Sequence, residues 1–217
     1  MYFAIIDEEF CNVAYGARSS KYYLKNEIIQ IGIVLLDEAY EEVDRFSAYV
    51  CPKFGHVDAF IRKLTGIDQY TASQGDYLEN VLDKLKEWMP EDTVMVSWSL
   101  SDLHQLRKEC EMKEIDTGWL QDKYDTWQDC QAEFSKKVKG IKNKQYNLEE
   151  ALCMSDVDIS GNCHDGMDDA YNTAQLFRKM RLEPEFKASR KYLKADEESE
   201  GITFSLGSLL SNIVLAS

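Results

Sequence analysis

Three short apolar runs near the start of the chain constrain its fold more than any other feature. They cover residues 2–6 (YFAII), 27–36 (EIIQIGIVLL) and 43–50 (VDRFSAYV), and Pro52 follows the third run. Runs of this length that are rich in β-branched and aromatic residues are typical of strands. Residues 37–40 are predicted to form a turn, and the short connections among the three strands favour an antiparallel meander.

Helical patterns dominate the remainder of the chain. Residues 77–88 carry apolar side chains at helical spacing and Pro90 ends the pattern, after which residues 93–98 (TVMVSW) predict a fourth strand. Further helices are predicted after an N-cap at Ser101 and at 128–138, 147–154 and 167–181, with a fifth strand at 123–127 (KYDTW). We therefore expect one α/β domain over residues 1–182, followed by an extension over 183–217.

Composition narrows the class of protein. The 217 residues are 44% hydrophobic and 12% aromatic, which suits a compact domain with its own core. No apolar run approaches the roughly 20 residues that cross a bilayer, and acids appear too early for a signal peptide, so a cytoplasmic protein without a membrane partner is expected. The six cysteines form no C-x-x-C pair; a zinc site at Cys163 and His164 is the weaker alternative to free thiols.

The net charge of −14 argues against nonspecific binding of nucleic acid through lysine and arginine. The charge remains compatible with an enzyme that binds the phosphate groups of its substrate through metal cations. One local exception is the segment 136–144 (KKVKGIKNK), which carries five lysines and is either a solvated loop or a guide for a polyanionic substrate.

A pair of carboxylates follows the first strand. Positions two apart on a strand face the same way, so Asp7 and Glu9 project together and Glu8 faces the opposite side. Two parallel carboxylates repel each other unless a cation joins them, and Mg²⁺ or Mn²⁺ prefers such oxygen ligands. The alternative is a merely polar strand end.

Two further segments supply acids and a histidine. Asp102 falls in the first turn of the helix after the fourth strand, where the helix dipole tolerates an anion. On the helix that begins near residue 167, helical phase places Asp169 half-buried and Asp168 in solvent, and His164 lies just before that helix. A half-buried acid needs a partner, which favours a shared site.

Taken together, these motifs resemble the DEDDh branch of the DnaQ-like exonucleases, which have an RNase H-like fold. The matching segments are 7–9 (D-x-E), 98–102 (W-x-x-x-D) and 164–169 (H-x-x-x-x-D), with landmarks in the same order at 27–32, 64–67 (LTGI) and 147–152. The H-x-G-x-D-D pattern and residues 127–134 (W-x-D-x-Q-x-x-F) are most similar to the histone-mRNA and RNA-trimming type. Cys11 and Ser99 depart from the residues frequent in that family.

The resemblance implies a mixed five-stranded sheet of order 3-2-1-4-5 flanked by helices. It also implies a 3′→5′ exonuclease that releases nucleoside 5′-monophosphates from single-stranded RNA or DNA with a free 3′ end. Its metal ligands for two divalent ions (Mg²⁺ or Mn²⁺) would be Asp7, Glu9, Asp102 and Asp169, with His164 as the general base. Substrate contacts are expected at Phe10, Leu64, Thr65 and Trp98.

The sequence is also compatible with two other functions. A pseudo-enzyme on the same fold would bind nucleic acid without cutting it, although all five catalytic positions are filled here. An acidic protein-interaction module would account for the net charge and for the apolar segment 202–217, which either docks on the core or mediates partner binding or self-association.

Overall fold

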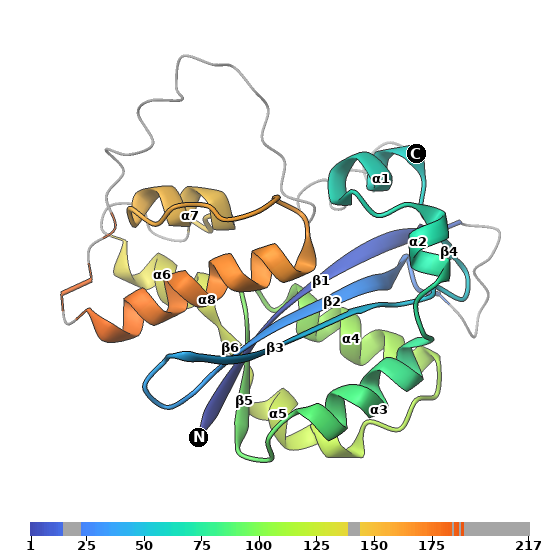
Figure 1. The fold of residues 1–217 in the computed structure, drawn as a ribbon, viewed down its shortest axis with the longest axis horizontal. Coiled ribbons are helices and arrows are strands. Elements are labelled where there is room, and N and C mark those ends of the chain that lie inside the picture. The colour runs from blue at the N-terminus through green and yellow to red at the C-terminus, as the bar shows by residue number, and fades with distance from the viewer. Residues whose placement is uncertain (15–22, 139–143, 184, 187, 189–217) are drawn as a thin grey trace.

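The computed structural model describes residues 1–14, 23–138, 144–183, 185, 186 and 188. A central twisted sheet is covered by helices on both faces (Figure 1). No helix among the described residues is long and apolar enough to cross a membrane.

The main sheet has the order β3-β2-β1-β5-β6. Its strands are β1 (Tyr2–Val13), β2 (Asn26–Leu36), β3 (Glu42–Tyr49), β5 (Thr93–Ser97) and β6 (Gln128–Asp129). The first three strands pair antiparallel, whereas β1 with β5 and β5 with β6 are parallel. The predicted 3-2-1-4-5 order is confirmed; the two-residue β4 (Gly55–His56), which pairs with the end of β1, was not predicted.

Alternation along β1 divides the core between the two faces of the sheet. Ala4 and Ile6 pack with α3 (Leu78–Trp88) and α4 (Ser101–Met112), whereas Phe3 and Ile5 pack on the opposite side. That opposite side is covered by α6 (Cys130–Lys137), α7 (Leu148–Met154) and α8 (Gly166–Leu182). The helices α1 (Ala59–Thr65) and α2 (Gln69–Ser73) cover the far end of β1 and β2.

The prediction of a strand at residues 123–127 is wrong. This segment belongs to α5 (Gln121–Thr126), because Leu120 and Tyr124 lie four residues apart and are both buried. The fifth strand is instead β6, directly after it. The next helix therefore starts two residues later than predicted, at Cys130, with the Asp129 carboxylate capping Ala132 N–H at 2.7 Å.

Two helix starts differ in their agreement with the sequence. The predicted capping box of α7 is present: Asn147 and Glu150 each bond the other's backbone N–H. The predicted N-cap at Ser101 is wrong, since the helix begins there and Leu100 holds the cap position without a side-chain bond. The Ser101 hydroxyl instead lies 2.6 Å from the Ser99 hydroxyl.

Two predicted segments lie largely outside the described residues. Of the lysine-rich segment, residues 139–143 are not described, and Lys144 lies 3.3 Å from Glu150. Of the extension after residue 182, Phe186 contacts Phe134 with 6.1 Å between ring centroids. The boundary at 182 and the docking of the apolar segment stay predictions.

Candidate active site

β1 carries Asp7 and Glu9 through the middle of the sheet. The sequence led us to expect a strand that ends at Ile6, but the strand continues to Val13 because Cys11 and Val13 are again buried apolar positions. What ends at Ile6 is the pairing with β5. The register with β2 also shifts between Glu9 and Phe10, a bulge of the kind often found beside active sites.

Asp102 occupies the gap that β5 leaves beside β1. The Glu8 N–H, which has no partner on β5, donates to Asp102 Oδ1 at 3.2 Å. This contact fixes the first turn of α4 against the strand that bears Asp7. Burial raises the pKa of Asp102 to about 7, although hydrogen bonds from backbone N–H groups and Ser101 oppose the rise.

The start of α8 is held tightly against the sheet. A Cβ on Gly32 of β2 would lie 2.3 Å from the Gly166 carbonyl oxygen, so only glycine permits this approach. Gln30 accepts the Gly166 N–H at 3.0 Å, and the Asp165 carboxylate caps the Met167 N–H at 3.0 Å. The sequence did not single out Gln30; its burial in an otherwise apolar strand was the available signal.

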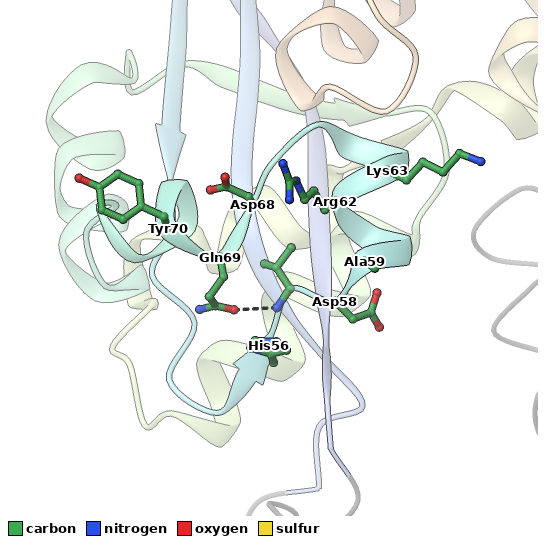
Figure 2. Close-up of a pocket in the computed structure, with 9 residues that line it drawn as sticks. His56, Asp58, Ala59, Arg62, Lys63, Asp68, Gln69 and Tyr70 are labelled. Atoms are coloured by element: carbon green, nitrogen blue, oxygen red, sulfur yellow. Dashed lines mark hydrogen bonds between the residues drawn. The ribbon is translucent and has the colours of Figure 1, made fainter.

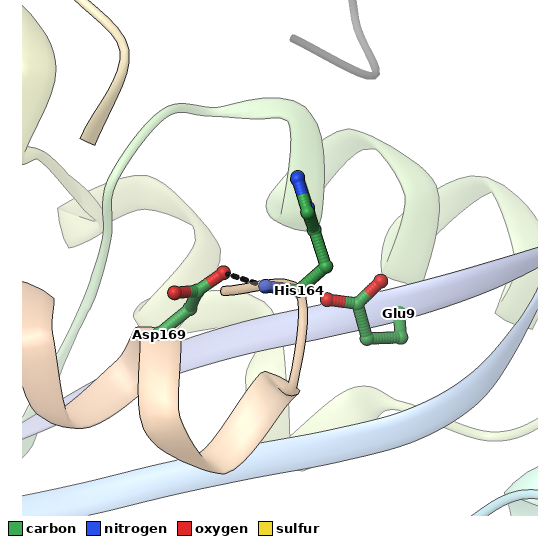
Figure 3. A group of neighbouring side chains, drawn as sticks. All are labelled: Glu9, His164 and Asp169. Carbon is green, nitrogen blue, oxygen red and sulfur yellow. Dashed lines mark hydrogen bonds between the residues drawn. The ribbon is translucent and has the colours of Figure 1, made fainter. Parts of the chain in front are cut away.

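A hydrogen bond from the backbone of His164 connects this residue to Asp169. The His164 N–H donates to Asp169 Oδ2 at 2.9 Å, and His164 adopts a left-handed conformation with φ of 64°. Such a conformation is uncommon for residues other than glycine and is found repeatedly at functional sites. In Figure 3, Glu9 and Asp169 lie on either side of His164, whose ring points away from the sheet. One potential ligand atom from each of the three residues lies within 4.8 Å of the others.

The four predicted metal ligands form one electrostatically strained cluster. Burial, followed by repulsion from Asp102, Asp169, Glu9 and Glu8, raises the pKa of Asp7 well above its usual value. Burial and repulsion from Asp169 and Asp102 do the same to the pKa of Glu9, and burial raises the pKa of Asp169.

A divalent cation fits this cluster. Within the described part of the chain, no lysine or arginine forms an ion pair with any of the four carboxylates. The donor set consists of carboxylate oxygens, with a histidine at its edge, which suits Mg²⁺ or Mn²⁺. Cys163 is not part of the cluster, and burial raises the pKa of its thiol to about 12, which disfavours the thiolate that zinc would require.

Two neighbouring acids differ from their predicted settings. Asp168, expected in solvent, is half-buried because its carboxylate accepts the Asn162 N–H at 2.7 Å and so holds the loop before α8. Glu8 faces away from Asp7 as predicted but is 4% exposed, and its carboxylate oxygens have no hydrogen-bond partner among the described residues. Burial raises the pKa of Glu8 well above its usual value, and Asp102 and Glu109 add to the rise.

The predicted substrate contacts lie in different environments. Phe10 and Leu64 are half-buried. Thr65 is buried, and its hydroxyl donates to the Ile61 carbonyl at 2.9 Å while accepting the Ile67 N–H. Trp98 is 8% exposed and packs against Phe134 in the core, which leaves little of its surface for a ligand. Their roles in substrate binding stay predictions.

Comparison with known proteins identifies the family. Residues 5–177 match the family model described as exonuclease (RNase_T). The chain belongs to the exonuclease family. Its acid and histidine motifs resemble those of the DEDDh type that the sequence predicted, and its fold is shared with a solved DEDDh family member.

Among curated relatives, the chain is 30% identical over 186 residues to ERI1 exoribonuclease 2 of Mus musculus, covering 74% of this chain and 26% of the relative. It is 27% identical over 167 residues to 3′-5′ exoribonuclease 1 of Rattus norvegicus, covering 71% of this chain and 47% of the relative. The chain thus spans about a quarter to a half of the length of these relatives.

A solved structure supports the fold of this exonuclease domain. The nuclease domain of 3′hExo, described as a DEDDh family member bound to rAMP, superposes with a TM-score of 0.66 at 24% identity, covering 87% of this chain and 96% of that chain. The 3′-exonuclease solved with the histone mRNA stem-loop superposes with a TM-score of 0.68 at 22% identity, covering 86% and 84%.

Proposed function

We propose that this exonuclease domain is a metal-dependent 3′→5′ exonuclease that removes nucleoside 5′-monophosphates from the 3′ end of a single strand. The observation that carries the proposal is the cluster of Asp7, Glu9, Asp102 and Asp169 without a cationic side chain among the described residues. A cluster of this kind costs stability until cations bind it, which is the expected property of a metal site rather than of a structural one.

Two divalent ions in this cluster would supply an activated water and would offset the negative charge that develops on the leaving 3′ oxygen. Asp7 and Glu9 hold the site from the rigid strand β1, whereas Asp102 and Asp169 close it from the first turns of α4 and α8. Because β1 belongs to the central sheet and α4 and α8 pack on its two faces, all four side chains project from regular elements, which favours a preorganised site.

His164 takes the proton from the attacking water in this proposal. Its backbone is fixed by Asp169, and its ring points away from the sheet. A ring nitrogen lies within 4.8 Å of oxygens of Glu9 and Asp169, so a water held by these acids would be within its reach. Phe10 and the α1 residues Leu64 and Thr65 are proposed to contact the terminal nucleotide. For Thr65 the backbone is the better candidate, since its hydroxyl already bonds the helix.

The substrate is proposed to be single-stranded RNA, with single-stranded DNA as the alternative. The curated relatives are named exoribonucleases, whereas exonuclease I of E. coli, solved with a dT13 oligonucleotide, superposes with a TM-score of 0.62 at 14% identity, covering 97% of this chain and 45% of that chain. The 2′-hydroxyl would have to be read for the two to be distinguished.

Digestion of matched RNA and DNA strands tests this function. Each strand carries a 5′ label, and a second set has a blocked 3′ end. We expect stepwise shortening from the 3′ end with Mg²⁺ or Mn²⁺, release of 5′-monophosphates, no digestion of blocked strands and none in EDTA. The Asp169→Asn protein, purified in parallel, controls for contaminating nuclease. Internal cleavage, or full activity in EDTA, would overturn the proposal.

A further inference from the structure

A cavity of about 670 Å³ lies between β4, α1 and α2 (Figure 2). None of the four catalytic carboxylates lines it. Its walls contain three basic side chains, His56, Arg62 and Lys63, and the aromatic ring of Tyr70. The proposed catalytic mechanism gives no role to this combination.

The charges in the cavity suit a ligand of low charge. The carboxylates of Asp58 and Asp68 are turned to the helix starts, where they accept backbone N–H groups of Ile61 at 2.9 Å and Thr71 at 2.8 Å. Arg62 and Lys63 are exposed, and neither forms an ion pair within the described parts of the chain. With His56 neutral, the two acids and the two bases cancel formally. Because the acids accept backbone N–H groups, Arg62 and Lys63 remain available for the phosphates of a short stretch of strand rather than of a dense polyanion.

An exposed aromatic ring belongs to the lining of the same cavity. Tyr70 is 72% exposed. An aromatic ring in solvent gains from stacking on a nucleobase, and proteins that bind single strands combine such rings with basic side chains. A nucleotide, which joins one phosphate to one flat base, matches both features.

Strand β1 connects the cluster of catalytic carboxylates to this cavity over a short distance. Asn12 of β1 pairs with His56 of β4, and Asn12 Nδ2 donates to Asp58 Oδ2 at 3.1 Å. Asn12 is three residues beyond Glu9 on one strand, which corresponds to about 10 Å. At roughly 3.4 Å per stacked nucleotide, this is a distance of about three nucleotides, and fewer in an extended strand.

We propose that this cavity holds a nucleotide of the substrate strand two or three positions to the 5′ side of the scissile bond. Tyr70 stacks on its base and Arg62 contacts its phosphate. Lys63, whose side chain points to the opposite side from Tyr70 in Figure 2, contacts a neighbouring phosphate of the same strand. The inference rests on the proposed exonuclease function, and it gives an acidic domain a local means of holding a strand. A dinucleotide would be too short to reach the cavity, whereas a strand of twelve nucleotides would fill it.

The test compares kcat/KM on a dinucleotide and on a 12-nucleotide strand. For Tyr70→Ala we expect a loss of roughly 10-fold on the long strand and no change on the dinucleotide. Tyr70→Phe, which keeps the stacking ring, should retain the wild-type values. For Arg62→Ser with Lys63→Ser, the slope of log kcat/KM against log salt on the long strand should decrease by about 1.4.

The control protein carries Lys86→Ser with Arg107→Ser on α3 and α4, which removes the same charge from exposed sites outside the cavity. It should keep the wild-type salt slope. Equal losses on both substrates, an unchanged rate on the long strand, or an equal slope change in the control would overturn the inference. A wild-type protein that cleaves neither substrate would instead reject the exonuclease function itself.

Discussion

Two groups of buried acids in this domain are stabilised in opposite ways. Glu27 and Glu109 are fully buried, and Lys113 lies between them at 2.8 Å and 2.7 Å. The remaining oxygens of both accept backbone N–H groups, among them Phe54 at 2.7 Å and Ile28 at 2.9 Å. The cluster of Asp7, Glu9, Asp102 and Asp169, which we propose binds metal, contains no such lysine among the described residues.

The difference separates acids that the chain neutralises itself from acids that we propose bind metal. In the Glu27–Lys113–Glu109 network, the chain provides its own cation, and the network ties α4 to β2 at the bulge opposite Phe10. In the proposed metal site the cation would come from solution. We therefore expect substitutions in the network to affect stability first and substitutions in the cluster to affect activity first.

The largest expected effect is on activity and comes from Asp169→Asn. Loss of residues that merely support a metal ligand already costs about 10- to 100-fold, so loss of a ligand should cost more than about 100-fold. The matched control is Asp168→Asn, which keeps an acceptor for the Asn162 N–H and should cost less than about 10-fold. Initial rates on a 5′-labelled strand measure both. Should Asp168 prove to be the essential acid, the assignment of the α8 face to the site is wrong.

His164→Ala should lower the rate at saturating metal by roughly 10²–10⁴ if His164 is the general base. Its affinity for Mg²⁺ or Mn²⁺ should then remain close to that of the wild type. Because a ring nitrogen of His164 lies within 4.8 Å of carboxylate oxygens of Glu9 and Asp169, a role as ligand is the competing assignment. Recovery of most of the rate at raised metal concentration would favour that competitor.

Lys113→Met should destabilise the protein by about 3–5 kcal/mol, because two buried carboxylates lose their cation. Denaturant unfolding in the presence of EDTA measures the change. Asp7→Ala is the contrasting variant: it relieves repulsion in the cluster and should leave the metal-free protein as stable as the wild type, or more stable. If Asp7→Ala destabilised the fold as much as Lys113→Met, the contrast between the two groups would fail.

The smallest expected effect is the pH dependence of metal-free stability. The pKa values of Asp7, Glu9, Asp102 and Asp169 are raised in the folded state, that of Asp102 from 3.8 to about 7. Folded protein then binds more protons than unfolded protein, so stability is present below pH 3.8 and is lost as pH rises through about 7. Each kcal/mol lost should lower the Tm by roughly 2–4 °C. A Tm in EDTA that rose from pH 5 to pH 8 would contradict these shifts.

The sequence predicted which residues come together better than it predicted their supports. Asp7, Glu9, Asp102, His164 and Asp169 were named from motifs and helix phase and lie in one cluster in the structure, whereas their catalytic roles stay predictions. The Glu27–Lys113–Glu109 network was missed, because Glu27 meets Lys113, and Ile28 meets Glu109 81 positions away, only in the folded chain.

Local pattern also failed for short elements. β4 and β6 have two residues each, too few for any periodicity, and Tyr124 and Trp127 suggested a strand although burial of Leu120 and Tyr124 follows a helix. The predicted strand ended at Ile6, seven residues before β1 does, because three acids follow Ile6 in the sequence. A cation site would explain why Asp7 and Glu9 lie within the strand, and apolar periodicity does not report such a site. The burial of Glu8 on the opposite side has no such explanation.

Calorimetric titration of Mn²⁺ into the metal-free protein at pH 8 tests most directly whether the four carboxylates form a metal site. We predict saturable binding to the wild type and to Asp168→Asn. Binding should release protons, because the raised carboxyl pKa values favour protonation before metal binds. The measured heat should therefore vary with the ionisation enthalpy of the buffer. Asp7→Ala and Asp169→Asn should bind weakly or not at all. Equal affinity in all four proteins would contradict the metal-site assignment.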